Sequence, residues 1–200
     1  MADRRTRYTI EQVRQIEEGD AVRRVIFDGL SFHGLSLKEC LLAECSFEKA
    51  DLRNVRLSSA TFRECNLTGA LLAGAALFGA TFERCKLLGV DFREVERTEA
   101  LTFRGCNLDL ADFRGRDLSG VVFDRCSLVE ADLALTTLKK ASFAEADLTR
   151  VSLREAVFEQ TDLRGANLTG WSLRRDELKG TIMDRRQVEL LVYELGIQIM

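Results

Sequence analysis

Proline is absent from this chain of 200 residues, although its average share in proteins is about 5%. Because proline has no backbone N–H, each one would interrupt a continuous ladder of backbone hydrogen bonds. Its absence suits a chain that is paired along most of its length. Long apolar runs are also missing: no stretch approaches the length of a membrane span, and the N-terminus, MADRRTRYTIEQ, lacks the apolar core of a secretory signal. We therefore expect no membrane contact.

A strong excess of one charge is missing too. Lysine and arginine together number 29, aspartate and glutamate 32, and the net charge is −3. This balance excludes a basic nucleic-acid-binding protein. The chain is 46% hydrophobic, which is too apolar for a disordered protein. Its length favours one domain.

What the chain does contain is a repeat of five residues, clearest in ASFAE, ADLTR, VSLRE, AVFEQ, TDLRG and ANLTG from Ala141 to Gly170. The third residue of each five is Phe or Leu, the first is small, and the others are mostly polar. A period of five is neither 3.6 nor 2, so the pattern is not that of an amphipathic helix or a half-buried strand. Such self-similarity predicts a repeat architecture.

The repeat runs through most of the chain. Central Phe or Leu residues recur in fourteen successive fives from Phe27 to Phe92 and in sixteen more from Phe103 to Leu178. The next central position falls on Arg97 instead of a Phe or Leu, and the pattern resumes one residue later than expected. One extra residue therefore lies between Phe92 and Phe103, and we expect a register break at residues 93–102.

A longer period lies above the first. Five of the six cysteines are spaced by 20, 20, 21 and 20 residues: Cys45, Cys65, Cys85, Cys106 and Cys126. A period of 20 means four fives per coil, with like residues stacked in columns. The Phe, Leu and small first residues would point inward. At a coil spacing of about 4.8 Å, the thirty repeats predict an all-β solenoid roughly 36 Å long.

These repeats resemble the pentapeptide repeat family, and ADFRG at 111–115, TDLRG at 161–165 and ANLTG at 166–170 match its consensus closely. The resemblance implies a right-handed quadrilateral β-helix, which we place at residues 23–183. We expect helical caps at both ends, because each coil contacts only its neighbours.

Residues 1–22 lie outside the repeat. Thr9, Ile10, Glu11 and Gln12 fit a helix capping box. The helix that follows either covers the open end of the solenoid or binds a partner.

Residues 184–200 predict a C-terminal helix and an apolar tail. Its apolar residues either cover the last coil, with Trp171 as a plug, or meet a second copy across a two-fold axis. We expect dimerisation, through Val188, Leu191, Val192, Leu195 and Ile197.

Residues with catalytic potential are few. The only histidine, His33, takes an outward position, so no Ser-His-Asp or Cys-His pair is evident. The cysteines lack zinc-ligand spacing, and we interpret them as buried, reduced thiols, which favours a cytoplasmic location. We therefore expect no enzymatic activity, no metal and no cofactor.

The outward positions carry the candidate contacts. One face presents Asp51, Asp91, Asp112 and Asp132 at the second position of the repeat, interrupted by Leu71. The fourth position on the same face carries Arg53, Arg93, Arg114, Arg154 and Arg174. These charges form either a binding surface or an ordinary solvated one. The register break, with Glu96, Arg97 and Glu99, is either a contact site or a tolerated kink. Arg116 falls on a small, inward slot, so either its side chain escapes to solvent or the local register differs.

Within the family, the chain resembles the topoisomerase-interacting branch. It shares a short single solenoid, the stretch CKLLGVDF followed by the break, and an apolar C-terminal helix. The resemblance implies a non-enzymatic, dimeric, DNA-mimicking protein that binds DNA gyrase and protects it from quinolones or from natural poisons such as albicidin and microcins. It implies no direct contact with nucleic acid. The alternative is a scaffold module with an unrelated partner. The candidate gyrase contacts are Asp51, Asp91, Asp112, Asp132, Glu96, Arg97 and Glu99.

Overall fold

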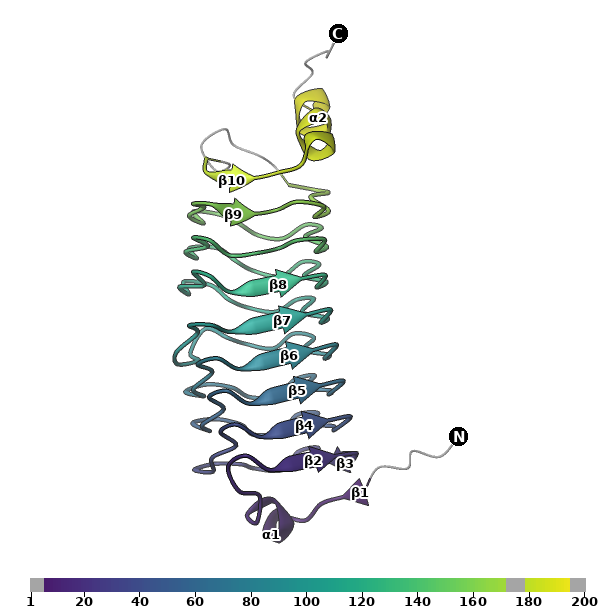
Figure 1. The fold of residues 1–200 in the computed structure, drawn as a ribbon, viewed down its shortest axis with the longest axis vertical. Helices are drawn as coiled ribbons and strands as arrows, with labels where there is room; N and C mark the ends of the chain where they lie inside the picture. The colour runs from purple at the N-terminus through teal and green to yellow at the C-terminus, as the bar shows by residue number, and fades with distance from the viewer. Residues whose placement is uncertain (1–5, 172–178, 195–200) are drawn as a thin grey trace, which may run out of the picture.

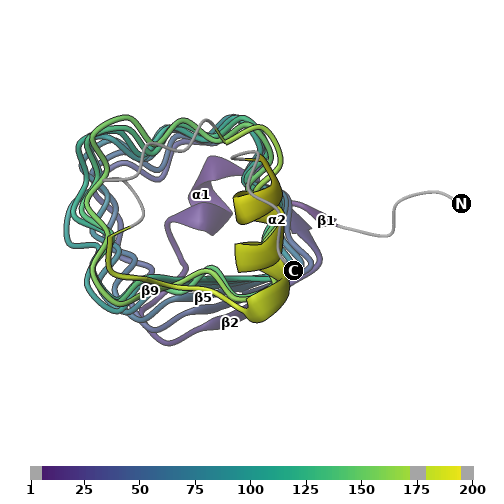
Figure 2. The same cartoon turned by 90° about the horizontal axis from the view of Figure 1, so that it is seen from above.

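The chain winds into a four-sided β-helix, as the repeat predicts, and the helix is right-handed, as the resemblance implies. The computed structural model describes residues 6–171 and 179–194. Figure 1 shows the stacked coils from the side, and Figure 2 shows their four-sided outline. The elements are β1 (Thr6–Arg7), α1 (Ile10–Val13), β2 (Ala21–Arg23), β3 (Val25–Ile26), β4 (Leu41–Ala43), β5 (Thr61–Arg63), β6 (Thr81–Glu83), β7 (Thr102–Arg104), β8 (Val122–Asp124), β9 (Thr161–Asp162), β10 (Thr181–Ile182) and α2 (Arg185–Glu194).

Parallel pairing one coil apart holds the rod together. Strands β2, β4, β5, β6, β7 and β8 form one parallel sheet in that order. Thr61 pairs with Thr81, a separation of 20 residues, and Thr81 pairs with Thr102, a separation of 21. The predicted coil length and the single extra residue are thus confirmed. Strand β2 joins the sheet from Ala21, two residues before the predicted start of the β-helix.

Four inward columns define four faces of the rod, in chain order A, B, C and D, so that face B lies opposite face D. Their central residues are Leu42, Phe62, Phe82, Phe103, Phe123, Phe143 and Leu163 on face A; Phe27, Phe47, Leu67, Leu87, Leu108, Leu128 and Leu148 on face B; Phe32, Leu52, Leu72, Phe92, Phe113, Leu133 and Leu153 on face C; and Leu37, Leu57, Leu77, Thr98, Leu118, Leu138 and Phe158 on face D.

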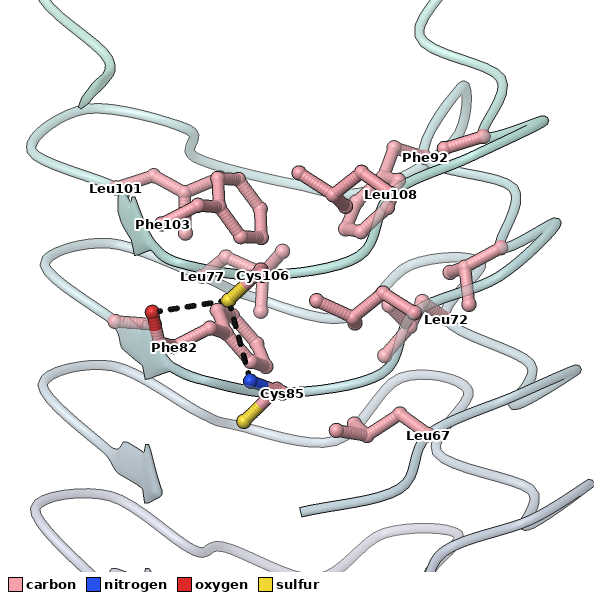
Figure 3. Close-up of a cluster of buried hydrophobic side chains, with 14 of the residues drawn as sticks. Leu67, Leu72, Leu77, Phe82, Cys85, Phe92, Leu101, Phe103, Cys106 and Leu108 are labelled. Atoms are coloured by element: carbon pink, nitrogen blue, oxygen red, sulfur yellow. Dashed lines mark hydrogen bonds between the residues drawn. The ribbon is translucent and has the colours of Figure 1, made fainter. Parts of the chain in front are cut away.

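The core consists of these columns, and the predicted inward direction of the Phe and Leu residues is confirmed. Phe62, Phe82 and Phe103 are fully buried and stack with centroid separations of 4.8 and 5.2 Å. The stack continues through Phe123 to Phe143. Figure 3 shows part of this core around Cys85 and Cys106. Leu173 and Leu178, the last predicted repeats, lie outside the described residues.

The N-terminal segment covers one end of the rod. The capping box is confirmed: Thr9 N–H donates to Gln12 Oε1 at 2.9 Å, and Gln12 N–H donates to Thr9 Oγ1 at 3.4 Å. Val13 is fully buried, and Tyr8 packs edge-on against Phe27. In Figure 2, α1 lies across the four-sided opening. These contacts favour the cap over a free partner-binding helix.

Helix α2 is attached to the other end through its first turn. Asp184 caps the helix by accepting from Gln187 N–H at 3.0 Å. The buried Gln187 amide donates to Leu163 O at 2.6 Å and to Ala166 O at 2.9 Å. Trp171 is buried, as predicted, and its Nε1–H donates to Leu148 O at 2.9 Å.

Of the predicted dimer residues, Val188 is 47% exposed and Val192 is half-buried. The side chain of Leu191 and the whole of Leu195 and Ile197 lie outside the described part of the structure. Dimerisation through this helix therefore stays a prediction.

Candidate interaction surface

The thiols in the described part of the interior are shielded from solvent. The six cysteines are unpaired and buried. The thiol of Cys85 donates to Phe62 O at 3.4 Å, and that of Cys106 donates to Phe82 O at 3.3 Å. Burial raises the pKa of the Cys85 thiol, so the unreactive protonated form persists.

The surface offers no metal site or membrane span within the described ranges. No group of three or more His, Cys, Asp or Glu side chains there could hold a metal ion. His33 is exposed on face C. Neither α1 nor α2 has the length and apolar character that crossing a bilayer requires.

The predicted Asp row does lie on face C. Asp91, Asp112 and Asp132 pair in register from coil to coil. Each carboxylate accepts the backbone N–H two residues on, as Asp91 does from Arg93 at 2.9 Å and Asp112 from Arg114 at 3.1 Å. This is an Asx turn, so the aspartates have a local structural role.

Arginines on the same face neutralise this row. Arg93 bridges Asp91 at 2.7 Å and Asp112 at 3.2 Å, and Arg114 bridges Asp112 at 2.6 Å and Asp132 at 3.5 Å. Further along the face, Asp51 is paired in the same way, by Arg53 at 2.8 Å. Hydrogen bonds from Arg93 lower the pKa of Asp91. The row is therefore a ladder of ion pairs rather than a column of free carboxylates.

The register break is a bulge of one residue, Arg97, on face D. Up to Glu96 the 20-residue pairing persists, since Glu96 pairs with Ala76. Thr98, only 7% exposed, takes the inward slot that Leu occupies in neighbouring coils. Its Oγ1–H donates to Asp117 O at 2.6 Å. The break is thus narrower than the predicted 93–102. Thr98 occupies the inward position for which the sequence offers no Phe or Leu.

Arg116 lies in the predicted small slot beside this bulge. Its side chain is half-buried, and Nη1–H donates to Arg93 O at 3.2 Å. Its Nε is buried with no partner among the described residues. The guanidinium is therefore partly exposed to solvent, and Arg116 keeps the inward position of the repeat that the sequence assigns to it.

Beside the bulge lies an apolar belt, which we define as the outward residues Leu71 and Ala73 on face C and Ala76 and Phe78 on face D. Leu71 is 48% exposed and Phe78 41%. The guanidinium of Arg97 lies 5.0 Å from the Phe78 ring centre, a cation–π contact. Sequence reasoning missed the belt, although ALLAGAALFGA at 70–80 contains no charged residue in a chain that is 30% charged.

Three exposed glutamates border the belt: Glu94, Glu96 and Glu99. None of the ion pairs in the described part of the chain involves them. The predicted candidates Glu96, Arg97 and Glu99 therefore lie beside the belt. Leu71 of the belt interrupts the Asp row on face C, between the coils of Asp51 and Asp91.

The stacked five-residue repeats place the chain among the repeat β-solenoids. Family profiles identify which one. A pentapeptide repeat region profile matches residues 22–92, and the eight-copy pentapeptide repeat profile matches 75–115, 106–143 and 131–170. The chain belongs to the pentapeptide repeat family.

Solved structures share this fold. A trypsin-treated form of QnrB1, a plasmid-mediated fluoroquinolone resistance protein, matches with a TM-score of 0.83 at 20% identity, over 98% of this chain and 96% of that one. Full-length QnrB1 matches with a TM-score of 0.67 at 22% identity, over 96% and 95%. HetL of the cyanobacterium Nostoc, involved in regulating heterocyst differentiation, matches with a TM-score of 0.62 at 28% identity, over 82% and 78%. A comparison with curated proteins finds no match.

Proposed function

We propose that this chain is a non-enzymatic cytoplasmic protein that binds DNA gyrase and protects it from quinolones or natural gyrase poisons. The observation that carries the proposal is the correspondence of the rod with QnrB1, a fluoroquinolone resistance protein, over nearly the full length of both chains. The short single solenoid, the bulge and the C-terminal helix support the same assignment.

Charge distribution shapes how such binding would work. Duplex DNA carries one negative charge per about 1.7 Å of its axis, whereas this chain has a net charge of −3. Its Asp row is also neutralised by Arg53, Arg93 and Arg114. The rod can imitate the shape of DNA but not its field, so we place recognition in local contacts at the bulge.

Direct binding tests the proposal. We expect the purified protein to bind immobilised gyrase in biolayer interferometry, and the variant D51N/D91N/D112N/D132N to bind about as well as the native chain. Absence of binding by folded native protein would refute the proposed function. If only the Asn variant loses gyrase binding strongly, the contact instead involves the Asp row.

A second candidate is a regulatory scaffold with a partner other than gyrase. The match to HetL, at 28% identity, favours it. Affinity capture from the source cells separates the two, because gyrase subunits should be enriched under the first proposal and absent under the second.

A further inference from the structure

The apolar belt departs from the columns in which its residues stand. Leu71 occupies the position that Asp51 and Asp91 hold in the adjacent coils of face C. Phe78 occupies the outward position that Ser58 and Glu99 hold on face D. Polar residues are thus compatible with both positions, and folding does not require exposed apolar side chains there. Exposed apolar groups on two adjoining faces of one coil are a feature of interaction surfaces.

The borders of the belt are chemically different. Toward the N-terminal end lie the polar residues Asn54, Ser58 and Ser59. The Asp51–Arg53 ion pair and Arg56, which is 3.9 Å from Glu18, lie in the same coil, so the charges on this side are paired. Toward the C-terminal end lie Glu94, Glu96 and Glu99, exposed and without an ion-pair partner among the described residues. A bound segment therefore meets apolar surface on one side and unpaired negative charge on the other.

The backbone beside the belt is also less tightly paired. Leu52 N–H donates to Leu71 O at 2.9 Å, and Leu71 N–H donates to Ala50 O at 3.0 Å. Between the coil of Leu72 and the next coil of face C, which contains Asp91, the described residues show no such bonds for Leu72 N–H and Asp91 N–H. This coil can therefore adjust with less loss of pairing than its neighbours when a partner binds.

We propose that the apolar belt and its glutamate border dock a segment of a protein partner that carries both apolar and Lys or Arg side chains. The apolar groups would cover Leu71 and Phe78, and the cations would pair with Glu94, Glu96 and Glu99. Nucleic acid is disfavoured as an occupant, because its phosphates would face these carboxylates. The identity of the partner as gyrase rests on the proposed function; the chemistry of the docking surface does not.

Variants that follow the columns test this inference without disturbing the fold. The variant Leu71→Asp with Phe78→Ser introduces residue types that already occur at these positions in neighbouring coils, namely Asp at 51 and 91 and Ser at 58. The matched control is Leu88→Thr with Leu110→Glu, which replaces two exposed leucines of face B by the residue types of Thr68 and Glu130 in their own columns. Circular dichroism melting checks that each variant folds.

Gyrase and synthetic peptides serve as separate probes. The peptides alternate Leu with Lys or, as the charge-reversed counterpart, Leu with Glu. We expect L71D/F78S to weaken binding of gyrase and of the Leu-Lys peptide at least about tenfold, equal to about 1.4 kcal/mol. L88T/L110E should bind like the native chain, and E94Q/E96Q/E99Q should reduce the salt dependence of binding.

The outcomes separate the two proposals. Gyrase binding that L71D/F78S leaves unchanged would overturn the docking surface while the proposed function stands. Belt-dependent binding of the Leu-Lys peptide without any gyrase binding would overturn the proposed function and support the docking surface. If neither probe depends on the belt, or if the Leu-Glu peptide binds as well, the docking surface is wrong.

Discussion

At the residue scale, the cysteine column shows how identical side chains are accommodated along the axis. Cys106 N–H donates to Cys126 Sγ at 3.4 Å, and Cys85 N–H donates to Cys106 Sγ at the same distance. The thiols of Cys85 and Cys106 also donate to Phe62 O and Phe82 O of the preceding coil, and that of Cys126 donates to Asp124 O of its own coil. The column thus replaces bonds that water would otherwise make.

Complete burial of the cysteines predicts their reactivity. None of the six should react with Ellman's reagent in the native protein, because the thiols are buried and burial keeps the Cys85 thiol protonated. All should react in guanidinium chloride. Rapid reaction of even one thiol under native conditions would show that its coil opens.

Thr98 illustrates a polar residue in an apolar column. Thr98→Val keeps the shape but removes the hydroxyl that donates to Asp117 O. We expect a loss of about 1–2 kcal/mol in the free energy of unfolding, because a partly buried carbonyl loses its partner. Urea denaturation measures this value. No change would mean that the bond does not hold the bulge together.

At the element scale, the Asp–Arg ladder of face C makes stability depend on pH. Hydrogen bonds from Arg53 and Arg93 lower the pKa of Asp51 and Asp91 in the folded state. A lowered folded pKa adds stability that is fully present above the unfolded pKa, about 3.9. That stability is lost as the pH falls through the folded pKa.

Comparison with D51N/D91N/D112N/D132N isolates this contribution. The native protein should lose more stability than the variant between pH 7 and pH 3, measured as the shift of the urea midpoint. Asparagine keeps the Asx-turn acceptor but cannot form the ion pair. Equal shifts in both proteins would show that the ladder contributes nothing to the acid response.

The helix α2 predicts how two rods join. Val188→Asp with Val192→Asp places charge on two apolar residues one helical turn apart, so the variant should be a monomer by multi-angle light scattering if this helix forms the dimer interface. A dimer in both the variant and the native protein would move the interface elsewhere.

At the scale of the whole molecule, periodicity explains why so much of the fold could be predicted. A repeat of five with a superperiod of 20 determines which residues point inward, and the 21-residue cysteine spacing locates the extra residue. The pattern does not say which residue of 93–102 bulges outward. A leucine is missing there, and the burial of Thr98 together with its contact to Asp117 O shows which residue takes the inward position.

The candidate site was predicted only in part. Aspartate followed two residues later by arginine, as in DLR at 51–53 and DFR at 91–93, was a readable sign that the Asp row would be paired. The proximity of the apolar belt to Glu94, Glu96 and Glu99 depends on stacking residues that are about 20 positions apart. This proximity follows from the stacking of the coils in the structure and not from the sequence alone.

Gyrase supercoiling in the presence of a quinolone is the measurement that tests the account most directly. The native protein at low micromolar concentration should restore supercoiling of relaxed plasmid, L88T/L110E should do the same, and L71D/F78S should not. If folded native protein leaves drug-inhibited gyrase unchanged at every concentration, the proposed protection of gyrase is contradicted.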